Sequence, residues 1–152
     1  MDDPSGPPRR ASAVPFSALN WKAIAFGVLA DIFATGLMSL LLFVVLGARL
    51  AGPGVSGDLL EQTLLASNTY LALSFVGGLS CTVLGGFVAA RIAGRLEYYH
   101  GLFTGLGVLV FGELMMLNAP TEYALALRLL GDALLIPAAL WGAHLRKRAL
   151  QG

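Results

Sequence analysis

Charged residues are scarce in this sequence. They make up 12% of the 152 residues, whereas hydrophobic residues make up 57%. A soluble domain carries about 25% charged residues, and a soluble fold of this size could not remove so much apolar surface from water. Within residues 23–46 the only charged residue is Asp31, and within residues 63–90 there is none. This scarcity argues against a soluble helical bundle, whose exposed faces need charges at helical spacing.

Residues that build covalent, catalytic or metal sites are also few. Cys81 is the only cysteine and lies in an apolar segment, so neither a disulfide nor a zinc framework can form. His100 and His144 stand far apart without cysteines or carboxylates at ligand spacing, which argues against a metal site. Because no Ser/His/Asp pattern, phosphate loop or HExxH motif is present, we expect no catalytic residue, no cofactor and no enzyme activity. The net charge of +1 provides no field that would attract nucleic acid.

The sequence contains long apolar segments that are rich in glycine. Glycine contributes 19 residues, most of them inside these segments, and it is more frequent in membrane helices than in soluble ones. A membrane-spanning helix needs about 20 apolar residues. Four segments come close to or exceed this length, and the expected spans cover residues 21–46, 69–90, 100–117 and 123–143. The sequence therefore predicts an all-α fold, an integral membrane four-helix bundle surrounded by the lipid bilayer.

The segments outside these spans are polar or contain helix breakers. Residues 1–16 are rich in Pro, Ser and charge and are expected to form a disordered cytoplasmic tail, followed by a transmembrane domain over residues 17–148. The longest loop is expected at residues 47–63, although a helix could already begin within residues 58–65. A short polar connector at residues 91–99 should make the second and third spans antiparallel neighbours.

Basic residues predict the orientation of the chain. Lysine and arginine near span ends are retained in the cytoplasm. With the N-terminus inside, the outer segments hold only Arg49, and Arg128 lies within the fourth span. The cytoplasmic segments then hold the other basic residues: Arg9, Arg10, Lys22, Arg91, Arg95, Arg146, Lys147 and Arg148. We therefore expect both termini in the cytoplasm and the protein in the inner (plasma) membrane of a bacterium.

Small residues recur at a spacing of four in the spans, which places them on one helix face. Faces of this kind let membrane helices pack closely. The residues expected to form them are Ser74, Gly78, Thr82, Gly85, Gly86, Gly101 and Gly105. A lined pathway or a dimer interface would need the same faces, but we favour packing between helices of one chain.

Four ionisable residues fall inside the expected spans. Glu113 and Arg128 should both lie about 8–9 Å below the outer boundary on helices joined by a tight turn, and Asp132 follows Arg128 by one turn. Charges at such depth are usually buried and paired, so these three residues should form a network. Asp31 should lie near the midplane, either protonated or hydrogen-bonded to Thr35 or to a neighbouring helix.

These ionisable residues leave two classes of function open. The favoured class is a structural or accessory multi-pass membrane protein, which could act as a homo-oligomer or within a larger membrane complex. The alternative is a small proton- or cation-coupled transporter or channel that uses the intramembrane carboxylates of Asp31 and Asp132. The sequence contains no paired broken helices and no inverted repeat, which are typical of transporter sites. That favours the structural class.

Two stretches in the middle of the chain carry a resemblance. Residues 85–94 (GGFVAARIAG), followed by residues 100–105 (HGLFTG), resemble a pattern in a group of small bacterial four-helix membrane proteins of unknown function. The pattern is Gly-Gly-aromatic-x-Ala-x-Arg at a helix end, a short basic connector, and then His or Asn, Gly and a small residue. Asp31 and Asp132 are not part of it. The resemblance implies the four-helix hairpin architecture and no particular activity.

Overall fold

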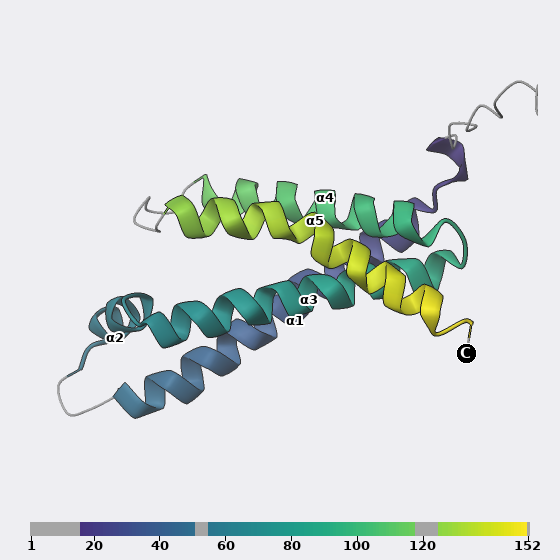
Figure 1. Cartoon of the computed structure of the whole chain (residues 1–152). Coiled ribbons are helices and arrows are strands. Elements are labelled where there is room, and N and C mark those ends of the chain that lie inside the picture. The colour runs from purple at the N-terminus through teal and green to yellow at the C-terminus, as the bar shows by residue number, and fades with distance from the viewer. Residues whose placement is uncertain (1–15, 51–54, 118–124, 152) are drawn as a thin grey trace, which may run out of the picture.

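A computed structural model of the chain describes residues 16–50, 55–117 and 125–151. Within these ranges the chain is helical and contains no strand, which confirms the predicted all-α fold (Figure 1). The elements are η1 (Phe16–Ala18), α1 (Trp21–Leu50), α2 (Gly57–Leu65), α3 (Asn68–Ala93), α4 (Glu97–Met116) and α5 (Leu125–Arg148). Residues 1–15 of the expected tail lie outside the described residues.

Three of the described helices are long and apolar enough to cross a membrane. They are α1, α3 and α4, whose most apolar stretches have mean hydropathies of 2.3, 1.9 and 1.3. Helix α5 has a comparable length of 24 residues, but Arg128, Asp132 and its basic last turn lower its hydropathy. The chain is therefore a helical protein with three apolar helices suited to a membrane. The expected fourth span stays a prediction.

The helix ends differ from the expected boundaries. Helix α1 continues to Leu50, into the expected loop, because the breakers Gly52 and Pro53 come only after it. Helix α2 is a separate short helix, and the Ser56 hydroxyl caps its N-terminus by accepting a hydrogen bond from the Leu59 N–H. The connector between α3 and α4 is only three residues long. Gly94 ends α3 with a φ of 66°, a left-handed conformation that glycine adopts without strain.

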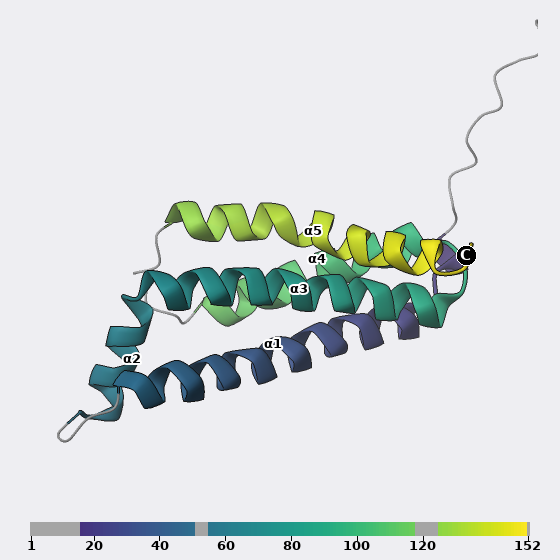
Figure 2. The ribbon, with the colours of Figure 1, turned by 60° about the horizontal axis from the view of Figure 1, so that its bottom comes forward.

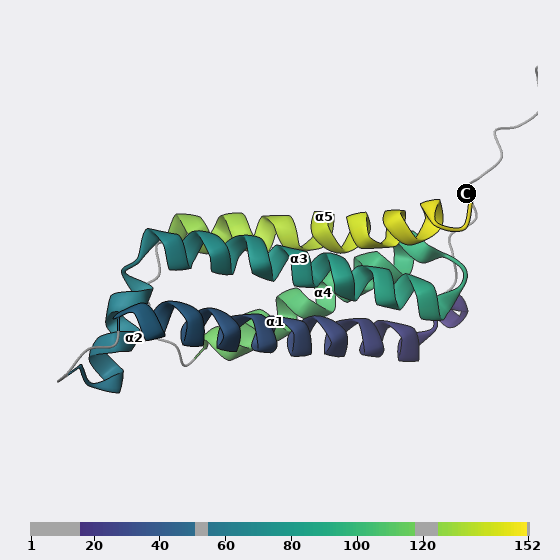
Figure 3. The ribbon, with the colours of Figure 1, turned by 90° about the horizontal axis from the view of Figure 1, so that it is seen from below.

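Helix α3 lies at the centre of the bundle. It contacts α1, α4 and α5, whereas α1 and α5 make no contact with each other in the described ranges. Figures 2 and 3 show α1 and α5 on different sides of α3, with successive long helices running in opposite directions. The short connector makes α3 and α4 antiparallel neighbours, in agreement with the sequence.

The start of α1, the connector between α3 and α4, and the end of α5 lie together (Figure 1). We call this the basic end, because its described basic residues are Lys22, Arg91, Arg95, Arg146, Lys147 and Arg148. The opposite end, where α1 and α4 finish, is the far end, and Arg49 lies there. The far half of the bundle consists of residues 36–50, 68–80, 107–116 and 125–136, and the remaining residues of α1, α3, α4 and α5 form the basic half.

Small residues bring the helix backbones together in the basic half. A methyl group built on Gly86 of α3 would stand 2.8 Å from the Ala139 Cα of α5, and one on Gly142 of α5 would stand 2.7 Å from the Phe87 nitrogen of α3. The core there is made of alanines with no exposed surface, namely Ala23, Ala89, Ala90, Ala139 and Ala143. Close backbone approach of this kind gains van der Waals contact, which drives helix association where lipid is as apolar as the side chains.

Candidate functional site

The structure brings Glu113, Arg128 and Asp132 together in the far half of the bundle. Arg128 Nη2 on α5 forms an ion pair with Glu113 Oε2 on α4. Asp132, one turn after Arg128, interacts electrostatically with both partners. We call these three residues the charge cluster. It joins the two helices that the sequence expects to be connected by a tight turn.

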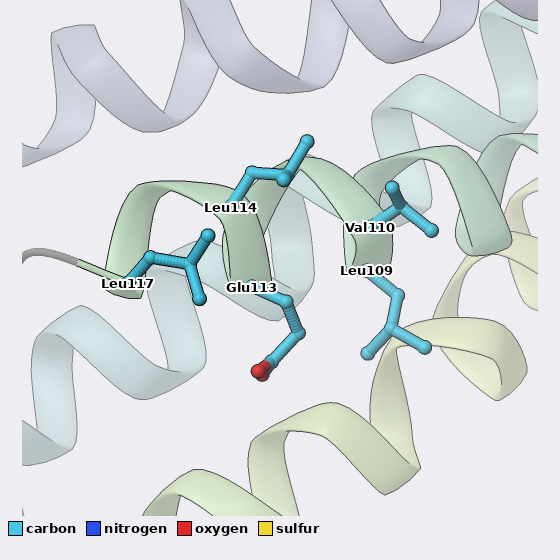
Figure 4. Close-up of a pocket in the computed structure, with 5 residues that line it drawn as sticks. All are labelled: Leu109, Val110, Glu113, Leu114 and Leu117. Carbon is cyan, nitrogen blue, oxygen red and sulfur yellow. The ribbon is translucent and has the colours of Figure 1, made fainter.

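The charge cluster lies open to its surroundings. The Arg128 and Glu113 side chains keep 37% and 45% of their surface exposed. Glu113 lines a groove of about 240 Å³ along α4, and its carboxyl group points toward α5 (Figure 4). The other residues lining the groove are Leu109, Val110, Leu114 and Leu117. The cluster is thus surrounded by an exposed apolar surface rather than by the bundle core.

The charge cluster has unequal numbers of acidic and basic groups, although an apolar surface surrounds it. It contains two carboxyl groups and one guanidinium group, and the carboxyl groups of Glu113 and Asp132 lie close enough to interact electrostatically. Two neighbouring carboxylates repel when both are ionised. In an apolar medium an uncompensated charge is costly. A shared proton or a second cation would balance the charges that the described residues bring together here.

Asp31 occupies a different environment, in the packed interior of the basic half. Its residue surface is 4% exposed. A methyl group built on Gly85 of α3 would stand 3.0 Å from the Asp31 Cβ, so α1 and α3 are in close contact at this point. The sequence pointed to Thr35 or a neighbouring helix as its partner. In the structure Asp31 interacts with the side chain of Thr82 on α3. The Thr82 hydroxyl donates to the Gly78 carbonyl oxygen, and Asp31 Oδ1 has no hydrogen-bond partner among the described residues.

Thr104 of α4 lies beside this contact between α1 and α3, so three helices meet at one junction. It has no exposed surface, and its hydroxyl oxygen has no hydrogen-bond partner among the described residues. This oxygen lies 3.0 Å from the position of a methyl group built on Gly27, which precedes Asp31 by one turn. Asp132 is not part of this junction, because α1 and α5 do not touch within the described ranges. Asp31 and Asp132, the two carboxylates that the transporter alternative would use, therefore lie in separate environments.

His100 is a buried polar residue whose role the sequence did not reveal. It has no exposed surface. Its Nε2 accepts a hydrogen bond of 2.9 Å from the backbone N–H of Asn20, and its Nδ1 lies 3.0 Å from the carbonyl oxygen of Leu96. These partners select the neutral form with the proton on Nδ1. Since Asn20 also caps α1 through its side-chain oxygen, His100 fixes the start of α1 against the start of α4. Eighty positions separate Asn20 from His100, and no local pattern could pair them.

The residues expected to pack helices fall into two groups, one in the basic half of the bundle and one in the far half. Gly85 faces α1, whereas Gly86, Gly101 and Gly105 face α5 at Ala139 or its neighbours. Thr82 is 1% exposed and lies against Asp31. In the far half, the Ser74 hydroxyl is buried without a hydrogen-bond partner among the described residues. A methyl group built on Gly78 would meet nothing within 4 Å of the described chain.

No group of three or more metal-ligating side chains occurs in the described part of the chain. His144 lies 2.8 Å from the Tyr98 hydroxyl and so has a partner of its own. No family model, curated protein or solved structure matches the chain. The resemblance to small bacterial membrane proteins therefore stays a prediction, carried by the glycine-rich ends of α3 and α4.

Proposed function

We propose that this chain is a four-span accessory membrane protein that binds a transmembrane helix of another membrane protein through its charge cluster. The observation that carries the proposal is the exposure of Glu113 and Arg128 amid apolar side chains. Their exposed neighbours include Val110, Leu114 and Met115 on α4, Leu117 directly after it, and Leu129 and Leu130 on α5. Charges on an apolar, lipid-suited surface are costly unless another protein covers them. We assign the chain no enzyme activity and no nucleic-acid partner.

The four-span arrangement is supported by the packing of α5. This helix runs antiparallel to α4 and contacts α3 and α4, two of the apolar helices. The basic residues gathered at one end favour placing that end, with both termini, in the cytoplasm. Reporter fusions test the topology: fusions at residues 55 and 120 should read outside, and fusions at residue 96 and at the C-terminus inside. A cytoplasmic reading at residue 55 would overturn the orientation.

The charge balance of the cluster indicates which partner fits. Among the described residues, Glu113 and Asp132 interact with one cation, Arg128. A helix that places a lysine or arginine at this depth would supply the missing positive charge. A second copy of this chain would bring the same surplus of carboxyl groups, and like charges facing each other disfavour association. The partner that fits is therefore a different protein with a basic residue inside its span.

Photo-crosslinking in native membranes tests this pairing. A photoreactive residue at position 114, beside Glu113 in the groove, should crosslink to one defined membrane protein, and the captured segment should contain an intramembrane lysine or arginine. Crosslinking should fall at least several-fold when Asp132→Asn removes the surplus carboxylate, or when the partner's basic residue becomes glutamine.

The control probe is placed at position 41, which is equally exposed in the far half but lies on α1. It should give no such product. A product consisting of two copies of this chain would contradict the heteromeric pairing. So would crosslinking that is the same from positions 114 and 41, or that does not depend on Asp132.

A second candidate function, a small proton- or cation-coupled transporter, is favoured by one observation. Asp31 is buried with one carboxyl oxygen unpartnered among the described residues. Intramembrane carboxyl groups of this kind occur in proton and ion pathways. Proton or cation flux into vesicles that contain only the purified chain, abolished by Asp31→Asn, would favour this function over the accessory role.

A further inference from the structure

We propose that the basic end of the bundle holds a binding site for an anionic phospholipid, at the last two turns of α5 and the first turn of α4. We call it the headgroup site. Its residues are Tyr98, Trp141, His144, Lys147 and Arg148. The proposal requires that α3 and α4 lie in a membrane, but it is independent of the charge cluster and of the protein partner proposed for it.

The side chains of the headgroup site form a continuous surface over two helices. Trp141, His144 and Lys147 follow one another on α5 at a spacing of three, which makes successive members neighbours on the helix surface. The Trp141 and His144 ring centroids are 6.2 Å apart. From α4, the Tyr98 hydroxyl oxygen lies 2.8 Å from His144 Nδ1, and Lys147 Nζ lies 5.1 Å from the centroid of the Tyr98 ring. Tyr98 therefore connects the histidine to the lysine across the two helices.

The order of these residues along α5 matches the order of groups along a phospholipid. A methyl group built on Gly142 would stand 2.7 Å from the Phe87 nitrogen, so this part of α5 is level with Phe87 of α3. Phe87 precedes the end of α3 at Ala93 by six residues, about 9 Å. Trp141 is 61% exposed at this level, where the hydrocarbon of a bilayer gives way to headgroups and tryptophan is enriched. Lys147 lies six residues further on, about 9 Å closer to water, where a lipid phosphate would lie.

The charge of the basic end is suited to an anion. Its described residues include the six basic side chains named above and one acidic side chain, Glu97. Lys147 and Arg148 are exposed, and neither forms an ion pair among the described residues. Clusters of lysine and arginine next to the cytoplasmic end of a membrane helix attract anionic lipid headgroups. The headgroup site therefore offers positive charge that the described part of the chain does not neutralise.

The exposed aromatic side chains favour a lipid over a free anion. A phosphate ion in water would contact the cations Lys147 and Arg148 and leave Trp141 uncovered. A phospholipid contacts both kinds of side chain at once, because its glycerol and acyl chains continue from the phosphate toward the level of Trp141. Leu145, which is exposed beside His144 on α5, adds apolar surface for such a chain.

Fluorescence quenching in lipid vesicles tests the site, because the chain has two tryptophans. Trp21→Phe leaves Trp141 as reporter, and Trp141→Phe leaves Trp21, which is exposed at the same end on α1, as the matched control. Vesicles of phosphatidylcholine contain either spin-labelled phosphatidylglycerol or phosphatidylcholine with the same label at the same mole fraction. The phosphatidylglycerol label should quench Trp141 about twofold more strongly. This ratio should fall to about one when Lys147→Gln and Arg148→Gln are combined, whereas these changes should leave the ratio at Trp21 unaltered.

Thermal unfolding of the natural protein in neutral detergent provides a second measurement. Phosphatidylglycerol should raise the unfolding midpoint above its value with phosphatidylcholine, and inorganic phosphate at equal ionic strength should not. The combined Lys147→Gln and Arg148→Gln variant should lose this difference, whereas Arg49→Gln at the far end should keep it.

Three results would overturn the proposal. They are equal quenching of Trp141 by the two lipids, a quenching ratio that survives the loss of Lys147 and Arg148, and a midpoint that inorganic phosphate raises as much as the lipid does. Both measurements use the purified chain without a partner protein. A negative result therefore concerns the headgroup site alone, and the crosslink from position 114 still decides the proposed function.

Discussion

The two halves of the bundle use glycine differently. In the basic half, methyl groups built on Gly27, Gly85 and Gly101 would stand within 3.0 Å of atoms in a neighbouring helix, most of them backbone or Cβ atoms. In the far half, methyl groups built on Gly77 and Gly107 would come within 3.0 Å of side-chain atoms only, and those built on Gly36 and Gly112 would meet nothing within 4 Å of the described chain. The same residue type therefore brings helix backbones together in the basic half, whereas in the far half it meets side chains or leaves helix surface uncovered.

The halves also differ in where polar residues are buried: the described polar residues that are fully enclosed, Asp31, Thr82, His100 and Thr104, all lie in the basic half. His100 in the basic half is buried and has partners for both ring nitrogens. In the far half, Glu113 and Arg128 pair with each other but remain well exposed. A group that is enclosed and satisfied contributes to the stability of the chain, whereas a charged group left open on an apolar surface is suited to meeting a partner. The basic half is thus the part that defines the fold, and the far half is the part available for association.

The largest effect is expected where two backbones meet. Gly86→Leu should abolish or severely reduce the folded yield in detergent, because the side chain would enter the Ala139 backbone of α5 and overpacking costs about 1–3 kcal/mol even where neighbours can yield. Gly78→Leu, the same change two turns earlier in α3, should be nearly neutral, as should Leu84→Ala at an exposed position. An equal loss of folded yield in Gly86→Leu and Gly78→Leu would show that glycine packs helices in the same way in both halves.

A smaller loss is expected from the buried histidine. His100→Ala removes the acceptor for the Asn20 N–H and leaves a cavity, so the free energy of unfolding should fall by about 2–3 kcal/mol. His144→Ala is the matched control, since His144 is partly exposed and bonds only to the Tyr98 hydroxyl in the described structure. Chemical or thermal unfolding in detergent measures both. If the two variants lose the same amount, His100 does not fix the start of α1.

The sequence was informative wherever the signal is local. Apolar runs predicted the all-helical fold, and equal depth on two adjoining spans suggested that Glu113 and Arg128 would meet. The sequence could not show that this pair remains exposed, because exposure depends on how α4 and α5 sit on α3. Nor could it find the bond between His100 and Asn20, which depends on the tertiary arrangement of α1 and α4. The partner of Asp31 is equally a tertiary property, and it lies on α3 rather than at Thr35 on its own helix.

The ion pair of the charge cluster should show a moderate coupling. Glu113→Gln and Arg128→Gln should each lower the folded yield because each removes the ion pair, and Arg128→Gln should cost more because it leaves both carboxyl groups without a cation on an apolar surface. The double variant should recover part of the loss, with a coupling of about 1 kcal/mol in a double-mutant cycle on unfolding in detergent. Strictly additive losses would show that the two side chains do not interact. Arg128 would then be assigned to Asp132, one turn away.

The smallest effect, and one of opposite sign between the halves, is expected from adding a single methyl group. Gly112→Ala and Gly36→Ala place it in open space on a helix, so they should raise stability in detergent by about 0.5 kcal/mol through higher helix propensity. Gly27→Ala places it 2.7 Å from the Ala89 Cβ and should instead lower stability. Comparing Gly112→Ala in detergent and in native membranes shows whether a partner covers this face of α4. If Gly112→Ala stabilises the purified chain but weakens the crosslink from position 114, the far half is covered by a partner in the cell. If it has the same small effect in both settings, that face of α4 lies against lipid.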